Sequence, residues 1–416
     1  MNKRIVFHID VNSAYLSWEA VYRLQHGAKL DLRKIPSAIG GSQEKRKGIV
    51  LARSMPARKY GIKTGESLYM ARNKCPQLVV LPPNYPLYIQ CSNAMMKILK
   101  EYSPIIQRYS IDEAFVDCGN IGGKAEQALE LAYQIKDRIK SRLGFTVNIG
   151  ISNNKLLAKM ASDFKKPDRV HSLYIEEIRE KMWPLAVEKL FFVGPATAKK
   201  LKTRGILTIG ELAKTDVNYL KQWLKSHGLL IWQYANGIED SAVQVDGPSI
   251  KGLGNSNTIA YDLLDRETAH QVLLALCETV GMRIRDIGKS AYLIAISIKN
   301  DKLVTYSHQK HLHVPISTTN CIYNNARELF DEAWREEAIR HLGVYLSSLS
   351  NGDTYQLSLF EKEADNLRNL DKTIDKIRLR YGRHAIIRST FINSKISPFM
   401  GGITGVEEYP MMSSLL

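Results

Sequence analysis

Three acidic residues occupy positions where a carboxylate could do chemistry. Asp10 lies inside the apolar run FHIDV, and Asp112 and Glu113 lie between the apolar stretches RYSI and AFV. A carboxylate embedded in a strand is costly unless a positive group compensates it. A divalent cation would do so, and Mg²⁺ prefers such oxygen ligands. Three carboxylates from two strands could hold two ions, although acidic residues in surface turns would explain either motif taken alone.

The elements that must position these residues follow from the hydropathy pattern. Residues 4–11 are predicted to form a strand that ends at Asp10, followed by a helix over 12–27. Residues 105–118 are predicted to form a hairpin with its turn at 110–113. Helices over 85–102 and 124–143 and a strand over 145–151 complete an alternation that indicates an α+β sheet domain.

Composition indicates the kind of partner. The 416 residues include 58 Lys and Arg against 42 Asp and Glu, and 29–74 alone carry 12 against 3. Such a basic stretch favours nucleic acid over the second option, an anionic membrane surface. No apolar run is long enough to span a bilayer. The five cysteines are scattered without a C-x-x-C pair, which argues against a disulfide framework or zinc site and fits the cytoplasm.

The motifs together resemble those of the Y-family of translesion DNA polymerases. The resemblance is carried by HIDVNSAYLSWE (8–19), ARSMPARKYGIKTG (52–65), YSIDEAFVD (109–117), NIGISNNKLLAKMASDFKKP (148–167) and a helix-hairpin-helix pattern over 190–213. Within this UmuC/DinB-like family, the chain looks closest to the UV-damage-repair polymerases of Gram-positive bacteria and their phages. The resemblance implies a cytoplasmic DNA-directed DNA polymerase, a nucleotidyltransferase for translesion synthesis in the SOS response to DNA damage.

The resemblance also implies an α+β multi-domain fold shaped like a right hand. The palm is expected at 1–28 and 75–172, the fingers at 29–74 and a helical thumb at 173–240. A linker is expected at 241–255, an α+β little finger at 256–348 and a C-terminal tail at 349–416. The formal charge of 249–348 is zero, which is unexpected for a DNA-binding unit. A basic face built from Lys299, Lys302 and Lys310 is one way to reconcile the two.

Carried over residue by residue, the resemblance implies the following roles. Two Mg²⁺ ions would be held by Asp10, the backbone carbonyl of Val11, Asp112 and Glu113. Tyr15 falls at the steric gate beneath the incoming sugar, and Arg58 and Lys166 fall at triphosphate-binding positions, as suits a leaving pyrophosphate.

Further positions would contact the nucleic acid and its machinery. The hairpin turn would contact the DNA backbone through Gly194, Ala196, Lys199 and Lys200. A structural pair of helices remains the alternative there. Gln356, Leu357, Leu359 and Phe360 resemble the peptide that binds the bacterial sliding clamp. The stretch 367–392 carries several arginines and has no assigned role.

The chain also departs from the family pattern. Met55 replaces a tyrosine that contacts the triphosphate in many relatives, and Met has no such donor. Ala196 stands where a glycine is common, and Pro195 removes one N–H donor. The expected partners are primer–template DNA, deoxynucleoside triphosphates and the clamp, with the chain a monomer. Two other functions stay open: a non-catalytic DNA- and clamp-binding factor that slows replication, and a two-metal nuclease.

Overall fold

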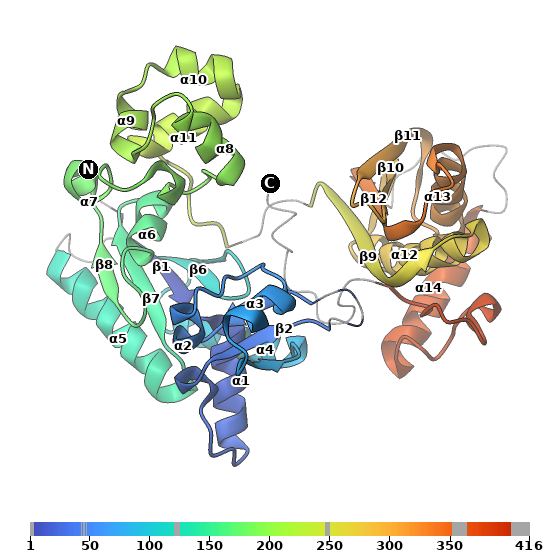
Figure 1. The fold of residues 1–416 in the computed structure, drawn as a ribbon, viewed down its shortest axis with the longest axis horizontal. Helices are drawn as coiled ribbons and strands as arrows, with labels where there is room; N and C mark the ends of the chain where they lie inside the picture. Colours follow the sequence, from blue (N-terminus) through green and yellow to red (C-terminus); the bar gives the residue numbers. More distant parts are fainter. Residues whose placement is uncertain are drawn as a thin grey trace. The chain divides into compact units, whose positions relative to one another are not determined.

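The chain forms two compact units, each of which is described by itself (Figure 1). The computed structural model describes residues 4–42, 44, 46, 48–119, 125–245, 250–351 and 364–400. Unit 1 comprises Met1–Gly41 and Ile49–Gly247, and unit 2 comprises Ser42–Gly48 and Pro248–Leu416. Within the described residues, no helix is long and apolar enough to cross a membrane.

Unit 1 is built on a five-stranded sheet with the order β5-β6-β1-β7-β8. The strands are β5 (Ile106–Arg108), β6 (Glu113–Asp117), β1 (Val6–Val11), β7 (Val147–Ser152) and β8 (Val170–Ser172). The central strand β1 is antiparallel to both of its neighbours, and β7 is parallel to β8. The hairpin predicted over 105–118 is therefore present as β5 and β6, with its turn where the sequence indicates it.

The two faces of this sheet are covered differently. Phe7, Ile9 and Val11 alternate along β1 and pack in one core with residues of three helices: α1 (Ala14–Gln25), α4 (Tyr85–Lys100) and α5 (Ala125–Leu143). Because successive side chains of a strand point to opposite faces, His8 and Asp10 lie on the other face. That face is covered by α6 (Lys155–Ser162), which packs against β1 and β7.

A second, three-stranded sheet of unit 1 has the order β3-β2-β4. Its strands are β2 (Ser37–Gly40), β3 (Val50–Arg53) and β4 (Val79–Leu81), with a short 3₁₀ helix η1 (Leu32–Lys34) and the helices α2 (Met55–Lys59) and α3 (Leu68–Lys74). β4 pairs in parallel with β2. The three-stranded sheet therefore extends seven residues past position 74, where the fingers were expected to end. The apolar triplet of β4 is too short to be recognised as a strand from its pattern.

The rest of unit 1 is helical. Its elements are η2 (Ile175–Glu177), α7 (Ile178–Lys181), η3 (Val187–Lys189), α8 (Pro195–Lys202), α9 (Ile209–Lys214), α10 (Val217–Leu224) and α11 (Ser226–Ala235). They share one apolar core with Leu156, Leu157 and Met160 of α6. The helices α8 and α9 form the hairpin pair predicted over 190–213.

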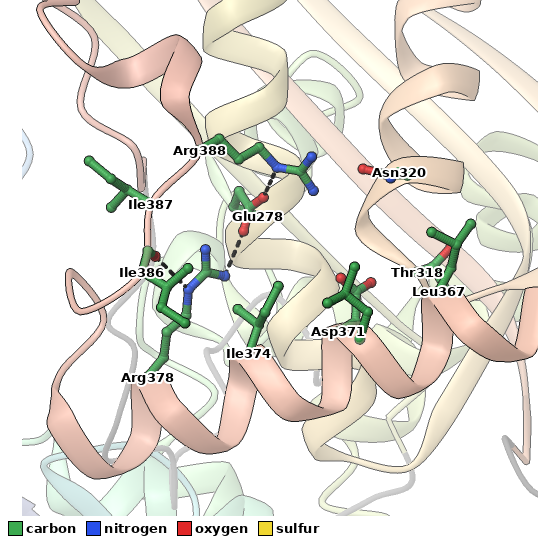
Figure 2. Close-up of a pocket in the computed structure, with 11 residues that line it drawn as sticks. Glu278, Thr318, Asn320, Leu367, Asp371, Ile374, Arg378, Ile386, Ile387 and Arg388 are labelled. Carbon is green, nitrogen blue, oxygen red and sulfur yellow. Dashed lines mark hydrogen bonds and ion pairs between the residues drawn. The ribbon is translucent and has the colours of Figure 1, made fainter.

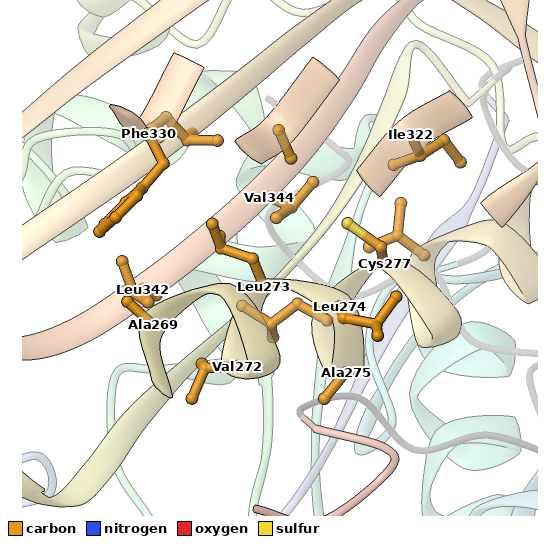
Figure 3. Packing of buried hydrophobic residues seen from close by; sticks show 14 of the residues in the cluster. Ala269, Val272, Leu273, Leu274, Ala275, Cys277, Ile322, Phe330, Leu342 and Val344 are labelled. Atoms are coloured by element: carbon orange, nitrogen blue, oxygen red, sulfur yellow. The ribbon is translucent and has the colours of Figure 1, made fainter. Parts of the chain in front are cut away.

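Unit 2 contains a four-stranded antiparallel sheet with the order β11-β10-β12-β9. The strands β9 (Gly252–Leu263), β10 (Lys289–Asn300), β11 (Thr305–Ile316) and β12 (Ile339–Asn351) pack against α12 (Arg266–Asp286) and α13 (Thr319–Ala333). Figure 3 shows Leu273 of α12 among Phe330 of α13 and Leu342 and Val344 of β12. The sequence pattern of this unit indicates helices over 267–287 and 320–339, and both are present, although the second ends six residues early.

The stretch 241–255, which was predicted to be a linker, ends in a β-strand rather than in coil. β9 begins at Gly252, and its glycines serve the sheet. A Cβ on Gly254 would lie 2.2 Å from Cδ1 of Tyr345 on the paired strand β12, so only glycine leaves room for that ring. Gly254, in the stretch expected to be a linker, is thus a strand residue covered by a cross-strand aromatic side chain.

The stretch 349–416, expected as a C-terminal tail, is folded over its described part, where 367–392 has a helix-like periodicity. α14 (Ala364–Tyr381) and the 3₁₀ helix η4 (Ser389–Phe391) belong to unit 2. Phe391 and Ile396 are buried in the core shared by α12, α13 and the sheet. This stretch is thus part of the folded unit.

Candidate active site

The antiparallel pairing of β1 with β6 brings the three predicted carboxylates to one end of the sheet. Asp10 is the direct register partner of Glu113, and the backbone N–H of Val11 donates to the carbonyl of Asp112 at 3.0 Å. Opposed residues of an antiparallel pair project on the same face, with Cβ atoms about 4.5–5.5 Å apart. The sequence placed these residues in two motifs a hundred positions apart, and the sheet makes them neighbours.

Two lysines provide the positive charge that these carboxylates need. The ammonium of Lys166 lies 2.6 Å from Oδ2 of Asp10 and 2.8 Å from Oδ1 of Asp163. The ammonium of Lys159, on α6, lies 2.9 Å from Oε1 of Glu113. With the side chains arranged this way, no three His, Cys, Asp or Glu residues in the described part of the chain form a metal-binding group.

The donor set nevertheless fits a hard divalent cation. The oxygens of Asp10, Asp112 and Glu113 lie at the ends of adjacent strands, and their mutual repulsion is a cost that a cation would remove. Burial, opposed by the hydroxyl of Ser110 at 2.6 Å and reinforced by the two neighbouring carboxylates, raises the pKa of Asp112 to about 6. Burial likewise raises the pKa of Asp10 even though Lys166 opposes that shift.

Glu113 behaves in the opposite way. Burial would raise its pKa, but its interactions with His8 and with the ammonium of Lys159 outweigh burial and hold the pKa of Glu113 below the ordinary value. Lys166 is the mirror case, since burial disfavours its charge while Asp10 and Asp163 raise the pKa of Lys166. At neutral pH both Glu113 and Lys166 are therefore charged.

The position of α6 depends on a glycine in β7. A Cβ on Gly150 would lie 1.9 Å from the carbonyl oxygen of Ala158 and 2.5 Å from the backbone nitrogen of Ser162. Only glycine therefore allows the helix to lie directly on the strand. This close approach carries Lys159 over the sheet to Glu113, and it brings the Ser162 hydroxyl to 2.8 Å from Nδ1 of the fully buried His8.

The segment that carries Lys166 is fixed by a buried amide. Nδ2 of Asn148 donates to the carbonyl of Ser162 at 2.9 Å and to the carbonyl of Lys165 at 2.8 Å. Asn148 is the register partner of Asp10 on the other side of β1. Asn148 thus lies next to Asp10 in the sheet, and it also fixes the backbone just before Lys166, the cationic partner of Asp10.

Tyr15 lies in the first turn of α1, within an aromatic cluster. Its ring stacks on Tyr88 of α4, with centroids 4.5 Å apart and planes 8° from parallel, and meets Tyr85 edge-on at 6.2 Å. Burial, together with the charge of Asp112, raises the pKa of Tyr15 to about 12. The ring is thus rigidly supported from one side and lies within electrostatic reach of the carboxylates.

Arg58 is exposed on the short helix α2, and no contact of the described residues joins it to Asp10, Asp112 or Glu113. Its neighbour in space is Arg53 of β3. Burial and then the charge of Arg58 lower the pKa of Arg53, so two guanidinium groups share one local field. Such a pair favours a multiply charged anion between or beside them.

The hairpin residues are all at the surface. Gly194 caps the N-terminus of α8, and Ala196, Lys199 and Lys200 are exposed on that helix. Lys202, in contrast, pairs with Glu188 at 2.8 Å. The clamp-type residues Gln356, Leu357, Leu359 and Phe360 lie outside the described residues.

Three residues near the site were missed by reasoning from sequence: His8, Lys159 and Arg53. His8 had a usable signal, because it lies two residues before Asp10 on the same strand and so on the same face. Lys159 lies in an apolar helix over Leu156, Leu157 and Met160, which is unusual for a lysine. Its partner Glu113 is 46 residues away, and no spacing rule links the two.

Two family models match this chain. The impB/mucB/samB family model matches residues 9–163, and the model of the C-terminal domain of that family matches residues 250–359. The first includes Asp10, Asp112 and Glu113, and the second includes the whole sheet of unit 2.

Curated relatives extend the likeness to nearly the full length. A protein of Clostridium acetobutylicum named DNA polymerase IV is 48% identical over 393 residues, which is 94% of this chain and 99% of the relative. The DNA polymerase IV of Acetivibrio thermocellus is 36% identical, with 94% and 98% covered. DNA polymerase IV 1 of Bacillus subtilis is 35% identical, with 96% and 95% covered.

Solved structures show the same fold. A chimaera described as a Y-family DNA polymerase superposes with a TM-score of 0.72 at 24% identity, covering 83% of this chain and 98% of the chimaera. An insertion ternary complex of Dbh DNA polymerase gives a TM-score of 0.57 at 24% identity, with 82% and 98% covered. The right-hand architecture of palm, fingers, thumb and little finger that the sequence predicted is confirmed.

Proposed function

This chain belongs to the impB/mucB/samB family of Y-family DNA polymerases, and we propose that the ends of β1 and β6 are where it carries out template-directed DNA synthesis. The observation that carries the assignment is the register of Asp10 with Glu113, next to Asp112. The enzyme is a DNA-directed DNA polymerase of the low-fidelity, translesion type, and the family predicted from the sequence is confirmed.

We propose domains close to those that the sequence predicts, with the palm at 1–28 and 75–172, the fingers at 29–74, the thumb at 173–240 and the little finger at 256–348. Two bounds move with the sheets, since the fingers also include β4 (Val79–Leu81) and the little finger begins with β9 at Gly252. In support, the carboxylates lie on the five-stranded sheet, and the three-stranded sheet with α2 and α3 carries the basic residues Arg53 and Arg58. The thumb would hold the DNA backbone at Gly194, Ala196, Lys199 and Lys200.

Asp10, Asp112, Glu113 and the carbonyl of Val11 would hold two Mg²⁺ ions. When bound, such ions supply Lewis acidity for the attacking 3′-hydroxyl and the leaving pyrophosphate. The ammonium of Lys166 lies 2.6 Å from Asp10 and balances its charge. A triphosphate bound beside Asp10 would therefore contact this ammonium. Arg58, with Arg53 beside it, would bind the other side of the triphosphate.

Tyr15 would select the sugar. Its ring is held by the stack on Tyr88, so it cannot turn away without breaking that contact. A ribonucleotide's 2′-hydroxyl placed over the ring would collide with a supported surface. The proposed partners are thus primer–template DNA and deoxynucleoside triphosphates, with the sliding clamp bound through Gln356, Leu357, Leu359 and Phe360. We expect a monomer that acts in the cytoplasm, where these substrates are.

The alternatives are not favoured. A non-catalytic factor that merely occupies the primer end would need no buried carboxylates, yet this chain maintains three of them at the cost of burial. The curated relatives are named as polymerases along almost their whole length. A two-metal nuclease would leave the stacked Tyr15 and the arginine pair of the fingers without a purpose.

Primer extension tests the proposal. The wild type and Asp112→Ala are given a primer–template, all four deoxynucleotides and Mg²⁺, and binding of the same DNA is measured by fluorescence anisotropy. We expect extension by the wild type only, with comparable binding by both proteins, because the substitution removes one proposed metal ligand. Extension that survives in Asp112→Ala would show that the site is wrong. Binding without extension by the wild type would favour the non-catalytic factor.

A further inference from the structure

The C-terminal segment after the matched family domain is anchored to unit 2 by buried ion pairs. Arg285 of α12 forms ion pairs with two acids of α14. Its Nη1 lies 3.2 Å from Oδ2 of Asp371, and its Nε lies 2.6 Å from Oδ2 of Asp375. Oδ2 of Asp371 also accepts the backbone N–H of Thr319 at 2.8 Å, at the start of α13. The helix is thus attached to both helices of the unit, and its orientation about its own axis is fixed.

A second set of contacts fixes the end of α14. Figure 2 shows Arg378 of α14 and Arg388 of the following segment converging on the buried Glu278 of α12. Nη1 of Arg378 lies 2.6 Å from Oε2 of Glu278, and its Nε donates to the carbonyl of Ile386. Glu278 is only 3% exposed, so removing it would leave two arginines without their shared counter-charge.

These anchors sort the charges of α14 onto two sides. The acids Asp371 and Asp375 are turned inward to Arg285, whereas Lys372, Lys376 and Arg380 are exposed. The three exposed cations are four residues apart, so they form one stripe along the helix with a rise of about 6 Å between neighbours. Within the described part of the chain, none of the three has an ion-pair partner.

The segment that carries this stripe holds an excess of positive charge that the preceding part of unit 2 lacks. Residues 249–348 carry 11 Lys and Arg against 11 Asp and Glu, whereas 366–400 carry 8 against 2. The basic face suggested from the sequence is compensated at Lys310, which lies 2.7 Å from Glu328, and His308 beside it lies 3.1 Å from Glu332, both of α13. α14 lies outside the matched family domain, which ends at residue 359.

We propose that the stripe Lys372–Lys376–Arg380 binds the phosphate backbone of the duplex DNA on which the enzyme works. The acids next to these cations in the sequence, Asp371 and Asp375, are already paired with Arg285. A row of evenly spaced cations is complementary to a row of phosphates, and such contacts hold DNA without reading its sequence. The proposal rests on the proposed function only in naming DNA as the polyanion. It gives the segment 364–400 a role as an added DNA-binding element next to residues 249–348, whose formal charge is zero.

Salt-dependent DNA binding tests this. Primer–template affinity of the full chain is measured by anisotropy between 50 and 300 mM KCl for the wild type and for Lys372→Gln/Lys376→Gln. Each lost phosphate contact should reduce the slope of log affinity against log salt by about 0.9, so the double variant should lose about 2. Adding Arg380→Gln should remove about one more. The loss should be equal for unrelated DNA sequences.

Two controls make the result specific. Lys97→Gln/Lys100→Gln removes the same charge from exposed positions of α4, which covers the far face of the palm sheet from Asp10, and its slope should match the wild type. Lys372→Arg/Lys376→Arg should retain the wild-type slope. An unchanged slope in Lys372→Gln/Lys376→Gln would overturn the proposal, as would an equal loss in the α4 control. Extension by the wild type at saturating DNA and low salt is measured alongside, so failure of the polymerase assignment would be seen separately from failure of this proposal.

Discussion

At the scale of single residues, the site is a set of buried carboxylates, each with a specific cation or hydroxyl beside it. Each of the three acids has a partner of its own. These partners are Lys166 for Asp10, Lys159 for Glu113 and Ser110 for Asp112. The arrangement explains why their pKa values move in different directions, with Glu113 lowered and Asp10 and Asp112 raised. Asp112 has a hydroxyl rather than an ammonium beside it, so no cation offsets the effect of burial on its charge.

The raised pKa of Asp112 predicts a pH-dependent stability effect. The folded chain holds this proton up to about pH 6, whereas the unfolded chain releases it near 3.8. The wild type therefore loses stability from this group as pH rises between those values, and Asp112→Asn does not. With EDTA present, Asp112→Asn should gain about 1–3 kcal/mol over the wild type at pH 7.5 relative to pH 4.5. Calorimetric melting at both pH values, with Asp117→Asn as the control on the same strand, measures it. An equal effect at both pH values would contradict the assignment.

The support under Tyr15 predicts sugar selectivity. Replacing Tyr15 with Ala should raise ribonucleotide incorporation relative to deoxyribonucleotide incorporation by tenfold or more, about 1.4 kcal/mol of lost discrimination. The ratio is measured with single-nucleotide kinetics. Tyr22→Ala, two turns further along α1 and facing His26, serves as the matched control and should leave the ratio unchanged. A wild-type ratio in Tyr15→Ala would mean that another residue contacts the sugar.

At the scale of elements, the site depends on how closely α6 lies on β7. Lys159 and Ser162 reach the sheet because Gly150 permits a helix backbone to touch the strand. Asn148 then holds the chain beyond the helix, up to the residue before Lys166. Gly150 and Asn148 of β7 thus position Lys159 and Lys166, the two lysines that face the carboxylates.

Gly150→Ala should therefore damage fold and activity together. The added methyl group would lie 1.9 Å from a backbone oxygen that no rotamer change can move, so α6 must shift. We expect a loss of at least about 2 kcal/mol in stability, measured as a lower melting temperature of unit 1, and slower extension. Gly194→Ala, where an added Cβ meets no atom within 4 Å, should lower the melting temperature much less. Equal melting temperatures for the two variants would contradict this account of α6.

The sequence predicted this level well where the pattern is local. Local hydropathy patterns predict several of these elements. They are the strands at 6–11, 113–117 and 147–152 and the helix at 85–100. β4 was missed because three apolar residues show no period, and α14 was left without a role because its buried surface is largely ionic. Asp371 and Arg378 look like solvated charges until Arg285 and Glu278, roughly a hundred residues earlier, are brought against them.

At the scale of the whole molecule, the two units divide the work. Unit 1 carries the carboxylates, the aromatic gate and the hairpin helices, whereas unit 2 carries a sheet whose formal charge cancels and a C-terminal helix that restores a positive surface. The proposed catalytic residues could be named from the sequence because family motifs mark them. Lys159 and the charge stripe of α14 were not, since both depend on contacts or exposure that only the folded chain defines.

The clamp-type peptide gives a prediction at this scale. Leu359→Ala/Phe360→Ala should abolish stimulation of extension by the sliding clamp, because the two apolar side chains would anchor in the clamp pocket. Basal extension should be unaffected. Ile387→Ala/Ile392→Ala removes two exposed apolar residues from the same C-terminal stretch and should leave stimulation intact. Clamp stimulation that persists in Leu359→Ala/Phe360→Ala would refute the peptide assignment.

The most direct test of the central claim compares two acids at opposite ends of β6. Glu113 faces Asp10 across the sheet, and Asp117 faces Val6 and pairs with Arg4. Single-turnover incorporation of one correct deoxynucleotide is measured with Mg²⁺ at saturating DNA. Glu113→Gln should be slower than the wild type by at least about 100-fold, and Asp117→Asn should be within a few-fold of it. Comparable rates for all three proteins would contradict the placement of the catalytic centre at the end of β1 and β6.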